Sequence, residues 1–98
     1  MSPQDRAIHQ GRLEVLRKAA RFEQETADGF EFTVDLRRMS AKDLDGWMEN
    51  EQKCCSFLQM SRHIDEAQPR ARVTVKCSPT MRSQVREAFG LKTTNPRR

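Results

Sequence analysis

The adjacent cysteines Cys54 and Cys55 are the residues of this chain best suited to chemistry. A thiolate is both a nucleophile and a ligand for soft metal ions. Glu51 precedes the pair by three and four positions, the spacings at which side chains on one helix meet. A carboxylate in that place can accept a thiol proton and help to generate thiolate. Glu51, Cys54 and Cys55 are therefore the candidate catalytic residues, and the two cysteines are the candidate metal ligands.

The pattern around these residues predicts a helix from Ala41 to about Phe57. At about 100° per residue, with Leu44 at zero, Cys55 falls near ~20° and Glu51 near ~340°. Glu51 thus lies in the middle of the apolar arc, where an ionised carboxylate is costly unless it is paired. We expect Glu51 to need a partner, and the two thiols are the nearest candidates along the chain.

Other side chains complete a candidate binding pocket near the pair. Positive charge would stabilise a thiolate, and the following strand offers Arg62 and His63 for this role. Aromatic side chains of the helix would line the pocket, whereas the third cysteine is in phase with an apolar strand face and favours core packing. The sequence offers no partner for His9. The candidate pocket residues are Trp47, Phe57, Arg62, His63 and Cys77.

The adjacent cysteines favour binding of a soft metal ion. Adjacent cysteines lack the C-x₂₋₄-C spacing of structural zinc sites, so a zinc site of Cys54, Cys55, His63 and Cys77 has plausible ligands but an unfamiliar spacing. Thiolates select soft cations, which accept fewer ligands. The sequence names no cofactor, and a soft metal ion is the candidate. Buried free cysteine is also common as a small hydrophobic residue, which leaves a purely structural role open.

The periodicity of hydrophobic residues and the positions of turn residues predict six secondary-structure elements. The first, third and sixth are helices with apolar stripes, and the others are strands in which apolar and polar residues alternate. Asp28-Gly29 is read as the stop of the first helix, Ser78-Pro79 as the start of the last and Gly90 as its end. The expected ranges are Gln4–Ala27, Phe30–Leu36, Ala41 to about Phe57, Leu58–Asp65, Arg70–Cys77 and Pro79–Phe89.

This order, α-β-α-β-β-α, predicts an α+β two-layer sandwich in which helices cover a three-stranded sheet. The last two strands are close enough in sequence to pair antiparallel. We expect one domain over residues 1–90 and a flexible basic tail over residues 91–98. So small a sheet leaves an edge, and a homodimer that extends or covers it is a further expectation.

Composition narrows the classes of partner. The chain has 98 residues, 36% hydrophobic and 33% charged, with a net charge of +4. No stretch approaches the ~20 apolar residues of a membrane span, and the first ten residues lack a secretion signal, so a cytoplasmic location without membrane contact is expected. Three cysteines in such a chain indicate free thiols. The arginines are scattered without aromatic residues between them, so a nucleic-acid partner is not expected.

A resemblance to a known family rests on the run from Leu44 to Leu58, which contains Glu-Asn-Glu-Gln-Lys-Cys-Cys-Ser-Phe. It is similar to the E-x-x-C-C-P-F hallmark of small, mostly uncharacterised bacterial proteins, some of which are encoded near heavy-metal resistance genes. The resemblance covers roughly Phe30 to Phe89. Glu51, Cys54, Cys55 and Phe57 match the hallmark, and Ser56 replaces its proline, which predicts a helix that continues past the cysteines.

Three functions follow as hypotheses. The first is thiol-dependent binding or sensing of a soft metal ion or thiol-reactive small molecule through Cys54 and Cys55. The second is a small thiol enzyme that acts on an electrophile or peroxide, with its substrate beside Trp47 and Phe57. The third is a structural or dimerisation module with cysteines in its core. Whether the two sulfur atoms face a solvent-reachable cavity distinguishes the first two hypotheses from the third.

Overall fold

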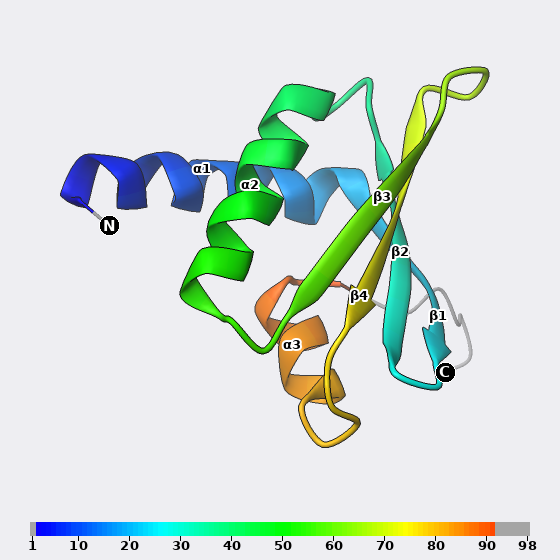
Figure 1. The fold of residues 1–98 in the computed structure, drawn as a ribbon. Helices are drawn as coiled ribbons and strands as arrows, with labels where there is room; N and C mark the ends of the chain where they lie inside the picture. The colour runs from blue at the N-terminus through cyan, green and yellow to red at the C-terminus, as the bar shows by residue number, and fades with distance from the viewer. Residues whose placement is uncertain (1, 92–98) are drawn as a thin grey trace.

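The computed structural model describes residues 2–91 and has an α+β architecture. Three helices lie on one side of an antiparallel four-stranded sheet with strand order β1-β2-β4-β3 (Figure 1). The expected fold class is confirmed, but the expected three strands and their order are wrong. The elements are α1 (Pro3–Ala19), β1 (Ala20–Thr26), β2 (Gly29–Asp35), α2 (Ala41–Cys54), β3 (Gln59–Asp65), β4 (Arg70–Lys76) and α3 (Arg82–Ala88).

The missing strand is β1, which the sequence pattern assigned to the first helix. Helix α1 ends at Ala19, and the next seven residues pair antiparallel with β2 through a two-residue turn at Ala27 and Asp28. This pairing buries Phe22 opposite Phe32, so burial outweighs the helical propensity of the intervening polar residues. Asp28-Gly29 is therefore a hairpin signal and not a helix stop.

Gly29 begins β2 because the neighbouring backbone comes too close for a side chain. A Cβ at this position would lie 1.8 Å from the carbonyl oxygen of Val75 on β4. Gly90, by contrast, follows α3 with a φ of 71°, the left-handed conformation of a helix C-terminal glycine. The expected end of the last helix at Gly90 is thus confirmed, and the helix begins only at Arg82.

The strands β2 and β3 both run antiparallel to β4, so they are parallel to each other with β4 inserted between them. Helix α2 connects the two and packs across the sheet (Figure 1). The expected antiparallel pairing of the last two strands is confirmed. This crossover places the start of α2 and its cysteine-bearing end over opposite ends of the sheet.

The core lies between the helices and one face of the sheet. Phe30 and Phe32 of β2 are fully buried with Trp47 of α2, whose ring meets that of Phe89 edge-on at 4.8 Å. Leu91 is also buried, so residue 91 belongs to the folded domain and not to the expected tail. Residues 92–98, the remainder of that expected tail, lie outside the described residues. In the part of the chain described, no helix is long and apolar enough to cross a membrane.

Candidate functional site

Helix α2 ends at the cysteine pair. Cys54 is its last residue, and Cys55 occupies the C-cap with φ −125° and ψ 82°. The backbone N–H of Cys55 still donates to the carbonyl oxygen of Glu51 at 2.8 Å, and the chain then turns so that the N–H of Leu58 donates to Cys55. The helix therefore does not continue past the cysteines, although serine replaces proline at position 56.

The change of direction at Cys55 gives the two thiols different surroundings. Cys54 is exposed, and Cys55 is half-buried. Cys55 lines a mainly apolar hollow of about 200 Å³ between the end of α2, the following turn and α3. The other residues of this lining are Glu51, Phe57, Leu58, Met81, Gln84, Val85, Ala88 and Phe89.

The partner of Glu51 is His9, which comes from α1. Its Nε2 lies 2.7 Å from Oε2 of Glu51, and the two side chains are only 14% and 17% exposed. A carboxylate oxygen accepts, so the proton of this hydrogen bond is on Nε2. The other ring nitrogen of His9 is buried and has no hydrogen-bond partner among the described residues. The carboxylate in the apolar arc is thus paired, but with a residue 42 positions away that the local pattern does not reveal.

Close packing of α1 against α2 makes this pairing geometrically accessible. A Cβ on Gly46 would lie 2.7 Å from the guanidinium of Arg12, whose Nε is 3.7 Å from the carboxylate of Asp43. Arg12 thus meets the start of α2, whereas His9, one turn earlier on α1, meets its end. Figure 1 shows the two helices crossing steeply, with α2 running from the top of the view down across α1.

Burial raises the pKa of the Cys55 thiol above its ordinary value of 9.0, and the negative charges of Glu51 and Cys54 add to this effect. Cys55 is consequently protonated at neutral pH. A protonated thiol is a poor nucleophile, so the site holds no preformed thiolate at Cys55. The same carboxylate attracts cations, which would replace the thiol proton.

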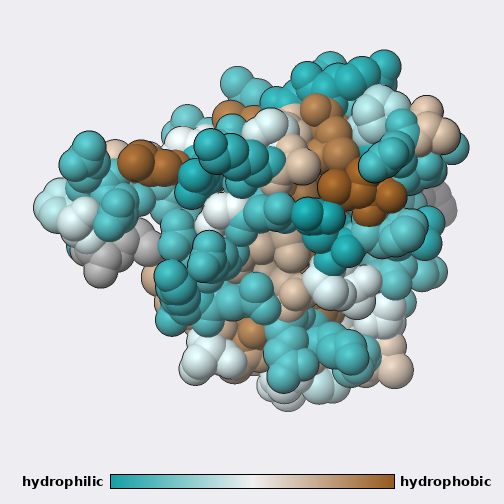
Figure 2. Space-filling model, turned by 45° about the horizontal axis from the view of Figure 1, so that its top comes forward, coloured by the Kyte–Doolittle hydropathy of each residue, from teal (hydrophilic) through white to brown (hydrophobic). Residues whose placement is uncertain are grey.

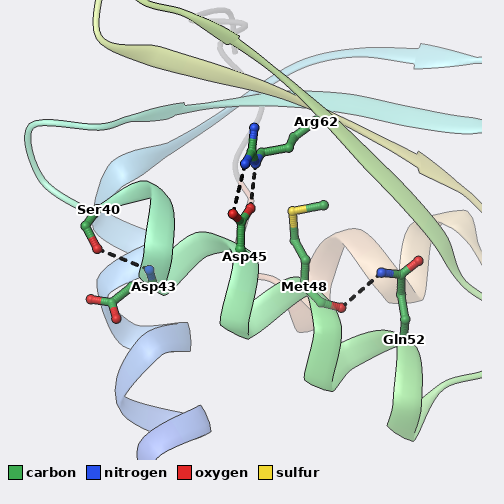
Figure 3. A network of polar contacts seen from close by, with 6 residues as sticks. All are labelled: Ser40, Asp43, Asp45, Met48, Gln52 and Arg62. Atoms are coloured by element: carbon green, nitrogen blue, oxygen red, sulfur yellow. Dashed lines mark hydrogen bonds and ion pairs between the residues drawn. The ribbon is translucent and has the colours of Figure 1, made fainter.

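The remaining predicted pocket residues are placed elsewhere. Figure 3 shows Arg62 reaching from β3 to Asp45 near the start of α2, where its two nitrogens donate to the carboxylate at 2.5 and 2.9 Å. His63 points to the opposite face of the sheet and faces Arg72 across the strands. Trp47 is fully buried in the core. Neither Arg62 nor His63 is therefore available to stabilise a thiolate at the cysteine pair.

Cys77 follows β4 and is also separate from the pair. Its side chain is buried, and its backbone N–H donates to the carbonyl oxygen of Asp28 at 2.9 Å. Burial is the main cause of its raised pKa. The proposed zinc set of Cys54, Cys55, His63 and Cys77 does not assemble, and residues 2–91 contain no group of three His, Cys, Asp or Glu side chains that could hold a metal ion.

Phe57 and Met81 distinguish the hollow from the rest of the surface. The face in Figure 2 is mostly hydrophilic, with hydrophobic atoms in limited patches. Among the described residues only three large hydrophobic side chains are exposed, and Phe57, at 51%, is the one that lines the hollow. Met81 adds a thioether, a soft donor for which the sequence carries no local signal near the cysteines. The arrangement thus combines two reachable thiols and a thioether with a paired carboxylate.

Comparisons of the chain with protein families, with curated proteins and with solved structures gave no match.

Proposed function

We propose that this protein binds a soft metal ion or a thiol-reactive small molecule through Cys54 and Cys55. The observation that carries the proposal is the access of both thiols: Cys54 is exposed, and Cys55 lines an open hollow. A pair sealed in the core would leave only a structural role. The resemblance to the E-x-x-C-C-P-F family, some of whose members are encoded near heavy-metal resistance genes, supports the same chemistry.

The electrostatics of the hollow favour a cation over a reaction that needs a standing thiolate. Burial, and to a smaller extent the charge of Glu51, raises the pKa of Cys55, which disfavours spontaneous attack on an electrophile. A soft cation can bind although the pKa of the thiol is raised, because a metal–sulfur bond forms as the thiol releases its proton. Glu51, already paired with His9, lies one helical turn from Cys55 and is the group placed to accept that proton before it passes to solvent. The thiol enzyme hypothesis therefore has less support.

Soft donors around the pair narrow the class of ion. Cu(I) and Hg(II) accept thiolate ligands at low coordination number, and thioether sulfur also suits Cu(I). Met81 lines the same hollow as Cys55 and is half-buried. We therefore include Met81 as an auxiliary ligand in the proposal, with Cys54 and Cys55 as the principal ones.

The test is titration of the reduced, metal-free protein with Hg(II) and, separately, with Cu(I), followed by calorimetry and by the ultraviolet absorbance of metal–thiolate bonds. The protein should bind one equivalent of ion. Cys54→Ser and Cys55→Ser should each abolish stoichiometric binding, with the circular dichroism spectrum unchanged. The matched control is Cys77→Ala, which removes a buried thiol outside the hollow and should retain one equivalent. Equal binding by the Cys54→Ser/Cys55→Ser double variant would end the proposal.

A further inference from the structure

The face of the sheet turned away from the helices presents a row of polar residues that spans all four strands. Strand register places Arg21 of β1 opposite Thr33 of β2, Thr33 opposite Arg72 of β4, and Arg72 opposite His63 of β3. Neighbouring strands are about 4.8 Å apart, so the row extends over roughly 14 Å. No described element covers this row, and the two arginines and the histidine are exposed.

Two adjoining hollows follow the row. The larger, of about 430 Å³, lies over the strands β1 and β2, and the smaller, of about 240 Å³, lies over β4 and β3. They share Thr33 and Arg70, so they adjoin along the row, and the two together are called the trough here. No phenylalanine or tryptophan lines the trough. Its basic side chains are Lys18, Arg21, Arg37, Arg38, Arg70 and Arg72.

Positive charge is concentrated in this trough. Six basic side chains line it against the carboxylates of Asp35 and Asp65, and two further carboxylates border it, so the face carries an excess of two positive charges. Exposed like charges in one place repel one another and favour an anionic ligand.

Among the described residues, none of the nearby carboxylates forms an ion pair with Arg21, Arg70 or Arg72. Asp35 is engaged by Arg37 and Arg38, and these contacts lower its pKa, the hydrogen bonds from Arg37 being the main cause. Two further carboxylates border the row. Glu23 accepts a hydrogen bond from the hydroxyl of Thr33, and Glu31 accepts one from the side-chain amide of Gln24.

The basic residues along the trough make few contacts with acidic side chains. Among the described residues, the one side-chain hydrogen bond of Arg70 goes to the amide oxygen of Gln68. Within residues 2–91, Lys18, Arg21, Arg70 and Arg72 form no ion pair with a carboxylate. Four cations are thus free to contact a ligand.

We propose that this trough binds the phosphate backbone of a single-stranded nucleic acid. Its length across four strands suits a chain of successive phosphates better than one small anion. Its lining offers positive charges to the phosphates and no aromatic platform to the bases, so binding should depend on phosphate contacts, which are independent of sequence and steeply dependent on salt. The scattered positions of these arginines in the sequence conceal the site, since strand pairing alone brings them together.

The experiment measures fluorescence anisotropy of a labelled mixed-sequence 20-nucleotide DNA strand over a range of salt concentrations. The Arg21→Gln/Arg72→Gln variant removes two phosphate contacts, so the slope of log K against log salt should fall by about 1.4. The same contacts correspond to a loss of affinity on the order of 50-fold at about 50 mM salt. The matched control is Arg6→Gln/Lys42→Gln, which removes the same charge from exposed positions on α1 and α2 and should leave the slope unchanged.

Several outcomes would overturn the proposal. One is the absence of binding by the unchanged protein at low salt, and another is an equal loss in both variants, which would indicate net charge alone. Tighter binding of the duplex of the same sequence would assign the face to a different ligand. Full competition by pyrophosphate at an equal concentration of phosphate groups would reduce the trough to a site for small anions. Binding by the Cys54→Ser/Cys55→Ser protein should be unchanged, which separates this proposal from the thiol site.

Discussion

The two ends of helix α2 each bear an acidic residue paired with a basic one, but in different surroundings. At the start, Asp45 pairs with Arg62 of β3, and the side chains are 48% and 32% exposed. At the end, Glu51 pairs with His9 of α1, and both are mostly buried beside an open hollow. The first pair is a contact between elements at the surface, and the second borders the hollow that the Cys55 thiol also lines.

This difference shows that the effect of a carboxylate on the apolar face of a helix depends on the residue with which it pairs. Hydrogen bonding from Arg62 lowers the pKa of Asp45, which keeps that carboxylate charged and unreactive. At the other end, the charge of Glu51 acts on a neighbouring thiol and raises the pKa of Cys55 after burial has already done so. The same helix thus fixes charge at one end and alters reactivity at the other.

The largest expected effect on stability comes from the buried side chains between the two ends of α2. Trp47 is fully buried and meets both Phe32 and Phe89 edge-on. Trp47→Ala should lower the free energy of unfolding by about 3–5 kcal/mol, because it leaves a large cavity under α2. Urea unfolding followed by circular dichroism measures this loss. Lys42→Ala on the exposed side of α2 is the control, and a loss under about 1 kcal/mol for Trp47→Ala would contradict this packing.

A smaller effect is expected at the cysteine end. Glu51→Gln should lower the free energy of unfolding by about 1–2 kcal/mol, because the amide oxygen of glutamine still accepts from His9 but forms a weaker, neutral hydrogen bond. It should also lower the pKa of Cys55, since the charge of Glu51 helps to raise it. Alkylation of Cys55 measured against pH, in a Cys54→Ser background, would then accelerate at lower pH.

The control for that experiment is Glu49→Gln. This residue carries the same charge on the same helix, but its exposed carboxylate contacts only Lys53, at 3.8 Å. Glu49→Gln should leave both the stability and the alkylation profile close to those of the unchanged protein. If Glu49→Gln and Glu51→Gln shift the pH profile of Cys55 alkylation equally, the shift is due to net charge and not to the position of Glu51.

The smallest effect is expected at the start of the helix. Arg62→Gln should cost about 0.2–1 kcal/mol, because the pair with Asp45 is exposed and screened. Since the pKa of Asp45 is lowered in the folded state, its contribution is present above the ordinary value of 3.8 and is lost as pH falls through the depressed value. The stability difference between the two proteins should therefore vanish in strong acid, as urea unfolding over a pH series would measure. A change in Cys55 alkylation would contradict the separation of the two ends.

The sequence predicted the elements whose patterns are local. Strict alternation from Phe30 to Leu36 and from Arg70 to Cys77 identified β2 and β4 to within one residue. Ser40 caps α2 through a hydrogen bond from the backbone N–H of Asp43, as the sequence of that turn indicates (Figure 3). Strand β1 was missed because Glu23, Gln24 and Glu25 favour a helix, and only pairing with β2 reveals a strand.

The candidate site was predicted in part, for the same reason. The placement of Glu51 beside Cys55 follows from spacing on one helix, which the sequence contains. The contact of His9 with Glu51 depends on how α1 crosses α2, and no local pattern encodes it. Arg62 was misplaced and Met81 was not considered as part of the site, because strand register and the position of α3 decide which side chains reach the hollow. Contacts within an element were accessible to sequence reasoning, and contacts between elements were not.

The position of β4 between β2 and β3 has a consequence for synthesis on the ribosome. The two outer neighbours of β4 precede it in the chain and, having no direct hydrogen bonds to each other, cannot close the sheet until it emerges. Long-range strand pairing of this kind forms late. The nascent chain therefore carries its two helix-end thiols in an incomplete fold until β4 has paired with both of its neighbours.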